Sequence, residues 1–74
     1  MTSRGRGINV RGEMVDMLLE RIARERHPSA AMMDVVEQLL SPDDVPVYAG
    51  ILFDKVKTER YPSLPMIRRL LAFT

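Results

Sequence analysis

The sequence predicts an all-α protein of four short helices, arranged as two helix-turn-helix hairpins with orthogonal or bundle-like packing. Three observations support this fold class. Apolar residues recur with the period of a helix in four segments. Residues that favour helix starts and stops separate these segments. The same short stretch also occurs twice, with an offset that matches the helix-turn-helix spacing.

The repeated stretch is Glu-Arg-His-Pro-Ser at residues 25–29, which returns as Glu-Arg-Tyr-Pro-Ser at residues 59–63, an offset of 34 residues (61 − 27). We therefore expect a single helical domain over residues 9–74, with repeat A at 9–40 and repeat B at 43–74, related by an approximate two-fold axis. Tetratricopeptide repeats have the same period, but their Trp and Leu-Gly signature is absent, so the sequence indicates no family.

Residues 1–8 contain two glycines and show no apolar periodicity, which predicts a flexible N-terminal arm. The arm is basic, because it contains Arg4 and Arg6 and no acidic residue; Arg11, just beyond it, also precedes the first acidic residue, Glu13. No apolar segment follows these arginines, so the sequence contains no secretory signal pattern.

The first helix is expected to begin after Asn9, whose side chain can accept a hydrogen bond from an exposed amide of the first turn. It should end at His27, since the ring of Pro28 disfavours helical geometry in the residue before it. Six apolar residues are expected on its buried face: Val10, Met14, Val15, Leu18, Leu19 and Ile22.

Ser29 is the expected cap of the second helix, and most of that helix should be covered because its polar stripe is narrow. Its apolar positions are Met32, Met33, Val35, Val36, Leu39 and Leu40.

The third helix should start at Asp43 or Asp44, which places Pro46 in the first turn, where proline is tolerated. It is apolar almost all round as far as Asp54, so we expect it to be the central, buried helix. Ser63 should cap the fourth helix. Five of that helix's apolar residues are expected to point inward, with Arg68 and Arg69 facing water: Met66, Ile67, Leu70, Leu71 and Phe73.

Residue content argues against catalysis and cofactor binding. There is no cysteine and a single histidine, His27, so neither a zinc site nor a nucleophile with a neighbouring base is indicated. Because Tyr61 takes the place of His27 in the second repeat, we expect the position to require a ring that packs at a helix end. We expect no enzymatic activity and no cofactor.

The leading functional hypothesis is a cytoplasmic, non-enzymatic protein-protein interaction or regulatory module that forms a homodimer or binds another protein. A body this small gains from burying apolar surface in a partner. Methionine is common at adaptable binding surfaces, and the candidate interaction residues are Met14, Met17 and Met33.

The alternative is a nucleic-acid-binding protein in which one hairpin acts as a helix-turn-helix and the basic arm enters the neighbouring groove. Its candidate contacts to phosphate or other anions are Arg4, Arg6, Arg11, Arg68 and Arg69. No membrane span is indicated, because the longest nearly apolar run, residues 45–53, is far shorter than the ~20 residues a bilayer requires. No small-molecule substrate is evident from the sequence.

Overall fold

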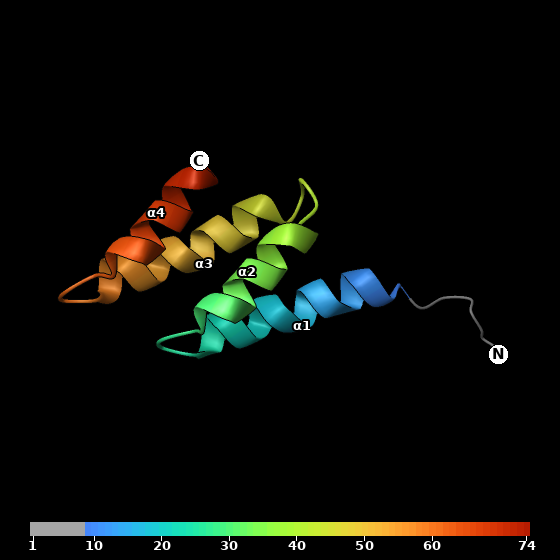
Figure 1. Cartoon of the computed structure of the whole chain (residues 1–74), viewed down its shortest axis with the longest axis horizontal. Coiled ribbons are helices and arrows are strands. Elements are labelled where there is room, and N and C mark those ends of the chain that lie inside the picture. Colours follow the sequence, from blue (N-terminus) through green and yellow to red (C-terminus); the bar gives the residue numbers. More distant parts are fainter. Residues whose placement is uncertain (1–8) are drawn as a thin grey trace.

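A computed structural model describes residues 9–74, and the predicted arm at residues 1–8 lies outside them. The described chain consists of four α-helices joined by short turns, as expected (Figure 1). Their bounds are Val10–Arg24 for α1, Ala30–Leu39 for α2, Val45–Thr58 for α3 and Leu64–Ala72 for α4.

All four helices start after a predicted capping residue, and at three of them the side chain of that residue caps the helix. The side chains of Asn9, Ser29 and Ser63 accept hydrogen bonds from the amides three residues later, at 3.0, 3.0 and 3.3 Å respectively. Each bond satisfies one of the amides that a helix start leaves without a partner.

The start of α3 is built differently. Asp44 occupies the cap position but makes no side-chain bond to the helix. Its carboxylate accepts from the Ser41 amide at 3.1 Å and from the Ser41 hydroxyl at 2.8 Å, so it closes the turn that joins α2 to α3. Pro46 lies in the first turn of the helix, as predicted.

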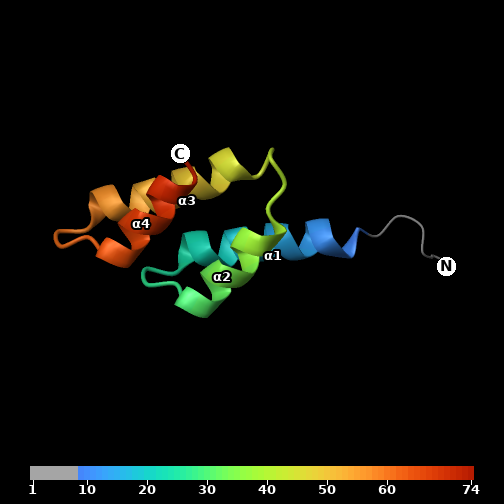
Figure 2. The same ribbon diagram turned by 45° about the horizontal axis from the view of Figure 1, so that its top comes forward.

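The two hairpins, α1–α2 and α3–α4, lie side by side in the same orientation. α1 and α3 run in one direction, α2 and α4 run back, and the rotated view shows the same relation (Figures 1 and 2). α1 packs against both α2 and α3, and α3 packs against α4. The expected two-fold relation is therefore wrong: the second hairpin is displaced sideways from the first, with its helices pointing the same way.

The core lies between α1, α2 and α3. Ile22, Val36, Tyr48 and Leu52 are completely buried, and Val15, Leu19 and Met33 complete the buried cluster. The Phe73 ring, just past the end of α4, packs edge-on against the Tyr48 ring with their centres 5.4 Å apart. No residue of α4 itself is fully buried, so α4 covers the core from outside.

Several side chains that the apolar pattern assigned to the interior are exposed. Val10 and Met14 on α1, Val35 on α2, Phe53 on α3 and Leu71 on α4 all face solvent. Periodicity shows which apolar residues share a helix face, but each helix has only one or two neighbouring helices to cover its apolar side chains. The excess remains at the surface.

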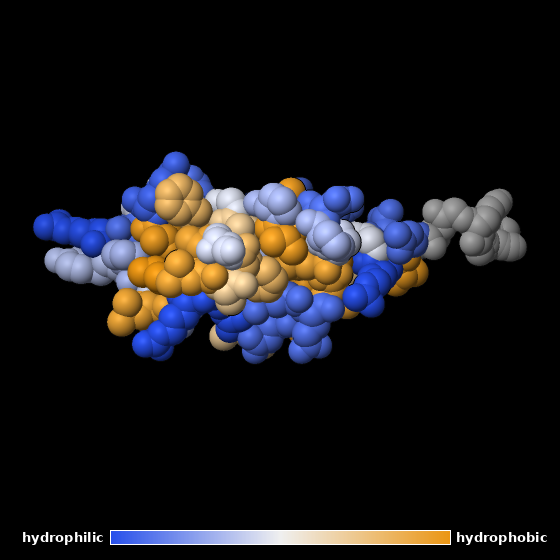
Figure 3. All heavy atoms as spheres, turned by 90° about the horizontal axis from the view of Figure 1, so that it is seen from above, coloured by the Kyte–Doolittle hydropathy of each residue, from blue (hydrophilic) through white to orange (hydrophobic). Residues whose placement is uncertain are grey.

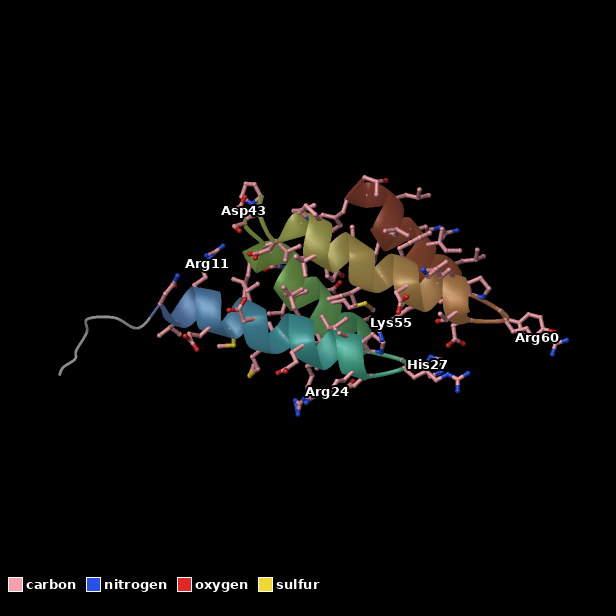
Figure 4. The ribbon with its side chains drawn as sticks, turned by 180° about the vertical axis from the view of Figure 1, so that it is seen from behind. Arg11, Arg24, His27, Asp43, Lys55 and Arg60 are labelled. Atoms are coloured by element: carbon pink, nitrogen blue, oxygen red, sulfur yellow. The ribbon has the colours of Figure 1, made fainter. Side chains whose placement is uncertain are left out.

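The prediction that His27 and Tyr61 pack as rings at helix ends is wrong. Both residues are exposed, and His27 sits in the turn after α1, away from the body (Figure 4). Pro28 is the buried residue of that turn. The position therefore does not require a ring.

Candidate interaction surface

Arg69 links α4 to α2 through two ion pairs. Its guanidinium nitrogen lies 2.8 Å from a carboxylate oxygen of Asp34 and 3.0 Å from one of Glu37. The same Glu37 oxygen accepts a short hydrogen bond from the Tyr48 hydroxyl on α3. Four side chains from three helices therefore form one connected polar cluster, which we call the bridge: Asp34, Glu37, Tyr48 and Arg69.

Burial and neighbouring charges shift the pKa values of two bridge residues, Tyr48 and Arg69. Burial, and next the hydrogen bond to Glu37, raise the pKa of the Tyr48 hydroxyl well above its ordinary value. Burial alone would lower the pKa of Arg69, but the hydrogen bonds and charges of Glu37 and Asp34 outweigh it, and the pKa is raised. A neutral phenol and a charged guanidinium suit a structural link between hairpins, because neither group exchanges protons near neutral pH.

A second link joins the hairpins where α1 ends. Lys55 of α3 extends to the end of α1, where its ammonium donates to the carbonyl of Ala23 at 3.1 Å and to that of Glu25 (Figure 4). These carbonyls have no partner within the helix, and a cation there also complements the helix dipole. Arg26 pairs with Glu59 at 3.2 Å, which connects the two inter-helix turns.

A wide groove of about 420 Å³ lies beside this second link. Among its lining residues only Asp54 and Lys55 ionise, and the ammonium of Lys55 is already engaged by backbone carbonyls. The groove is lined by Ala23, Pro46, Val47, Gly50, Ile51, Asp54 and Lys55.

Exposed apolar side chains gather at the two ends of the hairpin pair. The first group lies on α1 and α2, and its exposed fractions run from 41% for Met14 to 65% for Val10. On α1 these side chains share the helix face that carries Arg24, which points away from α3 (Figure 4). We call this surface the α1–α2 face: Val10, Met14, Met17 and Val35.

The second group lies at the opposite end. Phe53 on α3 is 54% exposed and Leu71 on α4 is 66% exposed, with Leu64 between these values. Viewed from the side of α3 and α4, apolar surface extends along much of the molecule (Figure 3). We call this surface the α3–α4 face: Phe53, Leu64 and Leu71. Only Val47 and Tyr61, among the large exposed apolar residues described, belong to neither face.

The three predicted interaction residues are separated by the fold. Met14 and Met17 lie together on the α1–α2 face. Met33 is buried in the core, so it does not contribute to an exposed interaction surface. Val35, also on α2, is exposed instead.

The basic candidates are not brought together in the described residues. Arg4 and Arg6 lie outside them. Arg11 is exposed near the start of α1 and donates to the Gln38 carbonyl at 3.4 Å. Arg68 is exposed on α4. Arg69 was expected to face water, but its side chain is only 19% exposed and is held by two carboxylates, which neutralise it as an anion contact.

Sequence reasoning missed the bridge and the exposed residues of α3 and α4. Glu37 and Asp34 gave one available signal, since both lie on the narrow polar stripe of α2, spaced to share one face. Nothing local indicated that Arg69, more than thirty residues away, would cover them.

Comparisons with protein-family models, curated proteins and solved structures found no match. Within residues 9–74 there is no cluster of three or more residues able to hold a metal ion. Nor does any helix in that range combine the length and apolar character that crossing a bilayer requires.

Proposed function

We propose that this protein is a helical protein-protein interaction module that associates with itself, the smallest assembly being a dimer. The observation that carries the proposal is the α1–α2 face, where Met14 and Met17 lie side by side on one helix face with Val10 and, across on α2, Val35. Clustered exposed apolar side chains on a small protein mark binding surfaces. Methionine also adapts its shape to a partner at little cost.

The proposal includes an internal duplication of the hairpin. Supporting it, the turns within the two hairpins match at the 34-residue offset: Glu25 and Glu59 follow α1 and α3, and Ser29 and Ser63 cap α2 and α4. A duplicated unit that packs on its own copy within one chain has a surface suited to further copies.

A non-enzymatic role in the cytoplasm completes the proposal. Among the described residues, the two groups with shifted pKa values, Tyr48 and Arg69, are tied to each other through Glu37 and form an internal link. Perturbed groups often mark catalytic sites, but here the packing of two hairpins accounts for them.

Sedimentation equilibrium of the full chain over a wide concentration range tests the proposal. We expect an average mass above that of the monomer, rising with concentration. Met17→Glu should weaken association at least tenfold because it places a charge in the apolar contact. Tyr61→Glu, an exposed site outside both faces, is the matched control and should behave as the wild type. A wild-type protein that stays monomeric throughout would refute self-association.

A further inference from the structure

The contact between the two hairpins can be compared with the surfaces that each hairpin leaves open. At the 34-residue offset, each side chain in the contact has a counterpart elsewhere in the chain. Arg69 on α4 corresponds to Val35 on α2, and Glu37 on α2 corresponds to Leu71 on α4. The contact pair is ionic, at 3.0 Å, whereas its counterpart pair is apolar and both members are exposed.

This paired replacement is what two surfaces that meet each other require. An arginine facing a leucine, or a valine facing a glutamate, would leave a charge desolvated without a partner. Val35 and Leu71 are instead matched in character, although they belong to different hairpins and their helices, α2 and α4, do not pack against each other.

Two buried residues also have exposed apolar counterparts, whereas Asp34, the second carboxylate that pairs with Arg69, corresponds to exposed Arg68. Tyr48, buried between the hairpins, corresponds to exposed Met14. At the other end, buried Leu19 corresponds to exposed Phe53. Each end therefore presents, uncovered, one large apolar counterpart of a residue that is buried within the chain.

A charged residue of the hairpin contact, Lys55, also has a charged counterpart. Lys55, which donates to the last carbonyls of α1, corresponds to Arg21 on α1. Arg21 lies on the helix face that carries Met14 and Met17. In a second copy it would reach the end of α3, where the Lys57 and Glu59 carbonyls correspond to those of Ala23 and Glu25 and the helix dipole attracts a cation.

We propose that a second copy of this chain docks its α1–α2 face on the α3–α4 face of the first, repeating between molecules the side-by-side arrangement of the two hairpins. Met14 and Val35 of one copy meet Leu71 of the other, and Met17 meets Phe53. The contact joins two different surfaces, so each addition leaves a free face at both ends and the assembly grows as an open head-to-tail stack. This inference rests on the proposed self-association and specifies its geometry.

Two variants test the geometry by complementation. Met17→Glu blocks the α1–α2 face, and Leu71→Glu blocks the α3–α4 face; both side chains are exposed, and circular dichroism checks that each variant keeps its helices. Sedimentation velocity should show species larger than a dimer for the wild type and monomers for each variant alone. An equimolar mixture of the variants should form a one-to-one dimer and nothing larger, because each supplies the face that the other lacks.

Other outcomes overturn the geometry. If one variant still dimerises alone, its intact face binds its own copy through a two-fold axis, and self-association survives while the head-to-tail contact does not. The same holds if the wild type associates but the mixture stays monomeric. A wild type that is monomeric at every concentration overturns both proposals. Tyr61→Glu should assemble as the wild type does.

Discussion

Arg69 on α4 and Glu37 on α2 lie 3.0 Å apart, joining two helices whose backbones do not approach each other closely. Glu37 also accepts a hydrogen bond from the Tyr48 hydroxyl on α3. One carboxylate of the first hairpin therefore contacts both helices of the second hairpin, α3 and α4. The orientation of the α3–α4 hairpin therefore depends on a few polar side chains as well as on the core.

Arg69→Ala should lower the free energy of unfolding by about 1–2 kcal/mol, because it leaves Glu37 and the buried Tyr48 hydroxyl without their compensating cation. Arg68→Ala, next to it and exposed, is the control and should change stability by less than about 0.5 kcal/mol. Urea unfolding followed by circular dichroism measures both. Equal effects for the two variants would show that the bridge adds no stability.

Tyr48→Phe should change how stability depends on alkaline pH. The ordinary tyrosine pKa is about 10, and the folded protein holds the Tyr48 pKa higher. The contribution of the Tyr48 hydroxyl to the free energy of unfolding is therefore complete below pH 10. Above pH 10 this contribution falls by about 1.4 kcal/mol per pH unit, because the tyrosine ionises in the unfolded chain before it ionises in the folded protein. Tyr48→Phe has no hydroxyl and therefore lacks this pH-dependent contribution to stability. Urea midpoints from pH 7 to 11 should fall more steeply for the wild type, and parallel curves would contradict the account.

Leu52→Ala should cost about 2–5 kcal/mol, since Leu52 is completely buried at the centre of the core and its loss leaves a cavity. That cost is comparable with the whole stability expected of a domain of this size. Circular dichroism at 222 nm should therefore show a largely unfolded variant. A melting curve like that of the wild type would place the core elsewhere.

The glycines of α1 and α3 should respond oppositely to alanine. A side chain at Gly50 meets nothing within 4 Å, so Gly50→Ala should raise stability by about 0.5–1 kcal/mol through its better helix propensity. A Cβ at Gly12 would lie 2.8 Å from the side-chain nitrogen Nδ2 of Asn9. Gly12→Ala should therefore displace the capping side chain and give no gain in stability. Thermal melts at one fixed protein concentration compare the two, and a stabilising Gly12→Ala would contradict the proposed role of the cap.

The helices and their starts could be predicted from sequence because they depend on nearby residues. Ser29 and Ser63 bond to amides three positions away, and Pro28 and Pro62 each follow a helix end. These are local interactions. The recurrence of apolar residues every three to four positions also predicts helices.

The surfaces could not be predicted, because they depend on which neighbours each helix has. Val10 and Met14 carry the same apolar pattern as Val15 and Leu19, yet only the second pair has α2 and α3 beside it. Arg69 was assigned to water for the same reason, since its carboxylate partners belong to another hairpin. A pattern within one helix cannot reveal a partner brought there by tertiary folding.

The most direct test of head-to-tail association is a dilution series of the wild-type protein, labelled at methyl and aromatic side chains, followed by nuclear magnetic resonance. We predict that signals from Met14, Met17 and Val35 shift with concentration together with those of Phe53 and Leu71, while the buried Ile22 and Leu52 stay constant. Shifts confined to one of the two faces, or no concentration dependence at all, would contradict it.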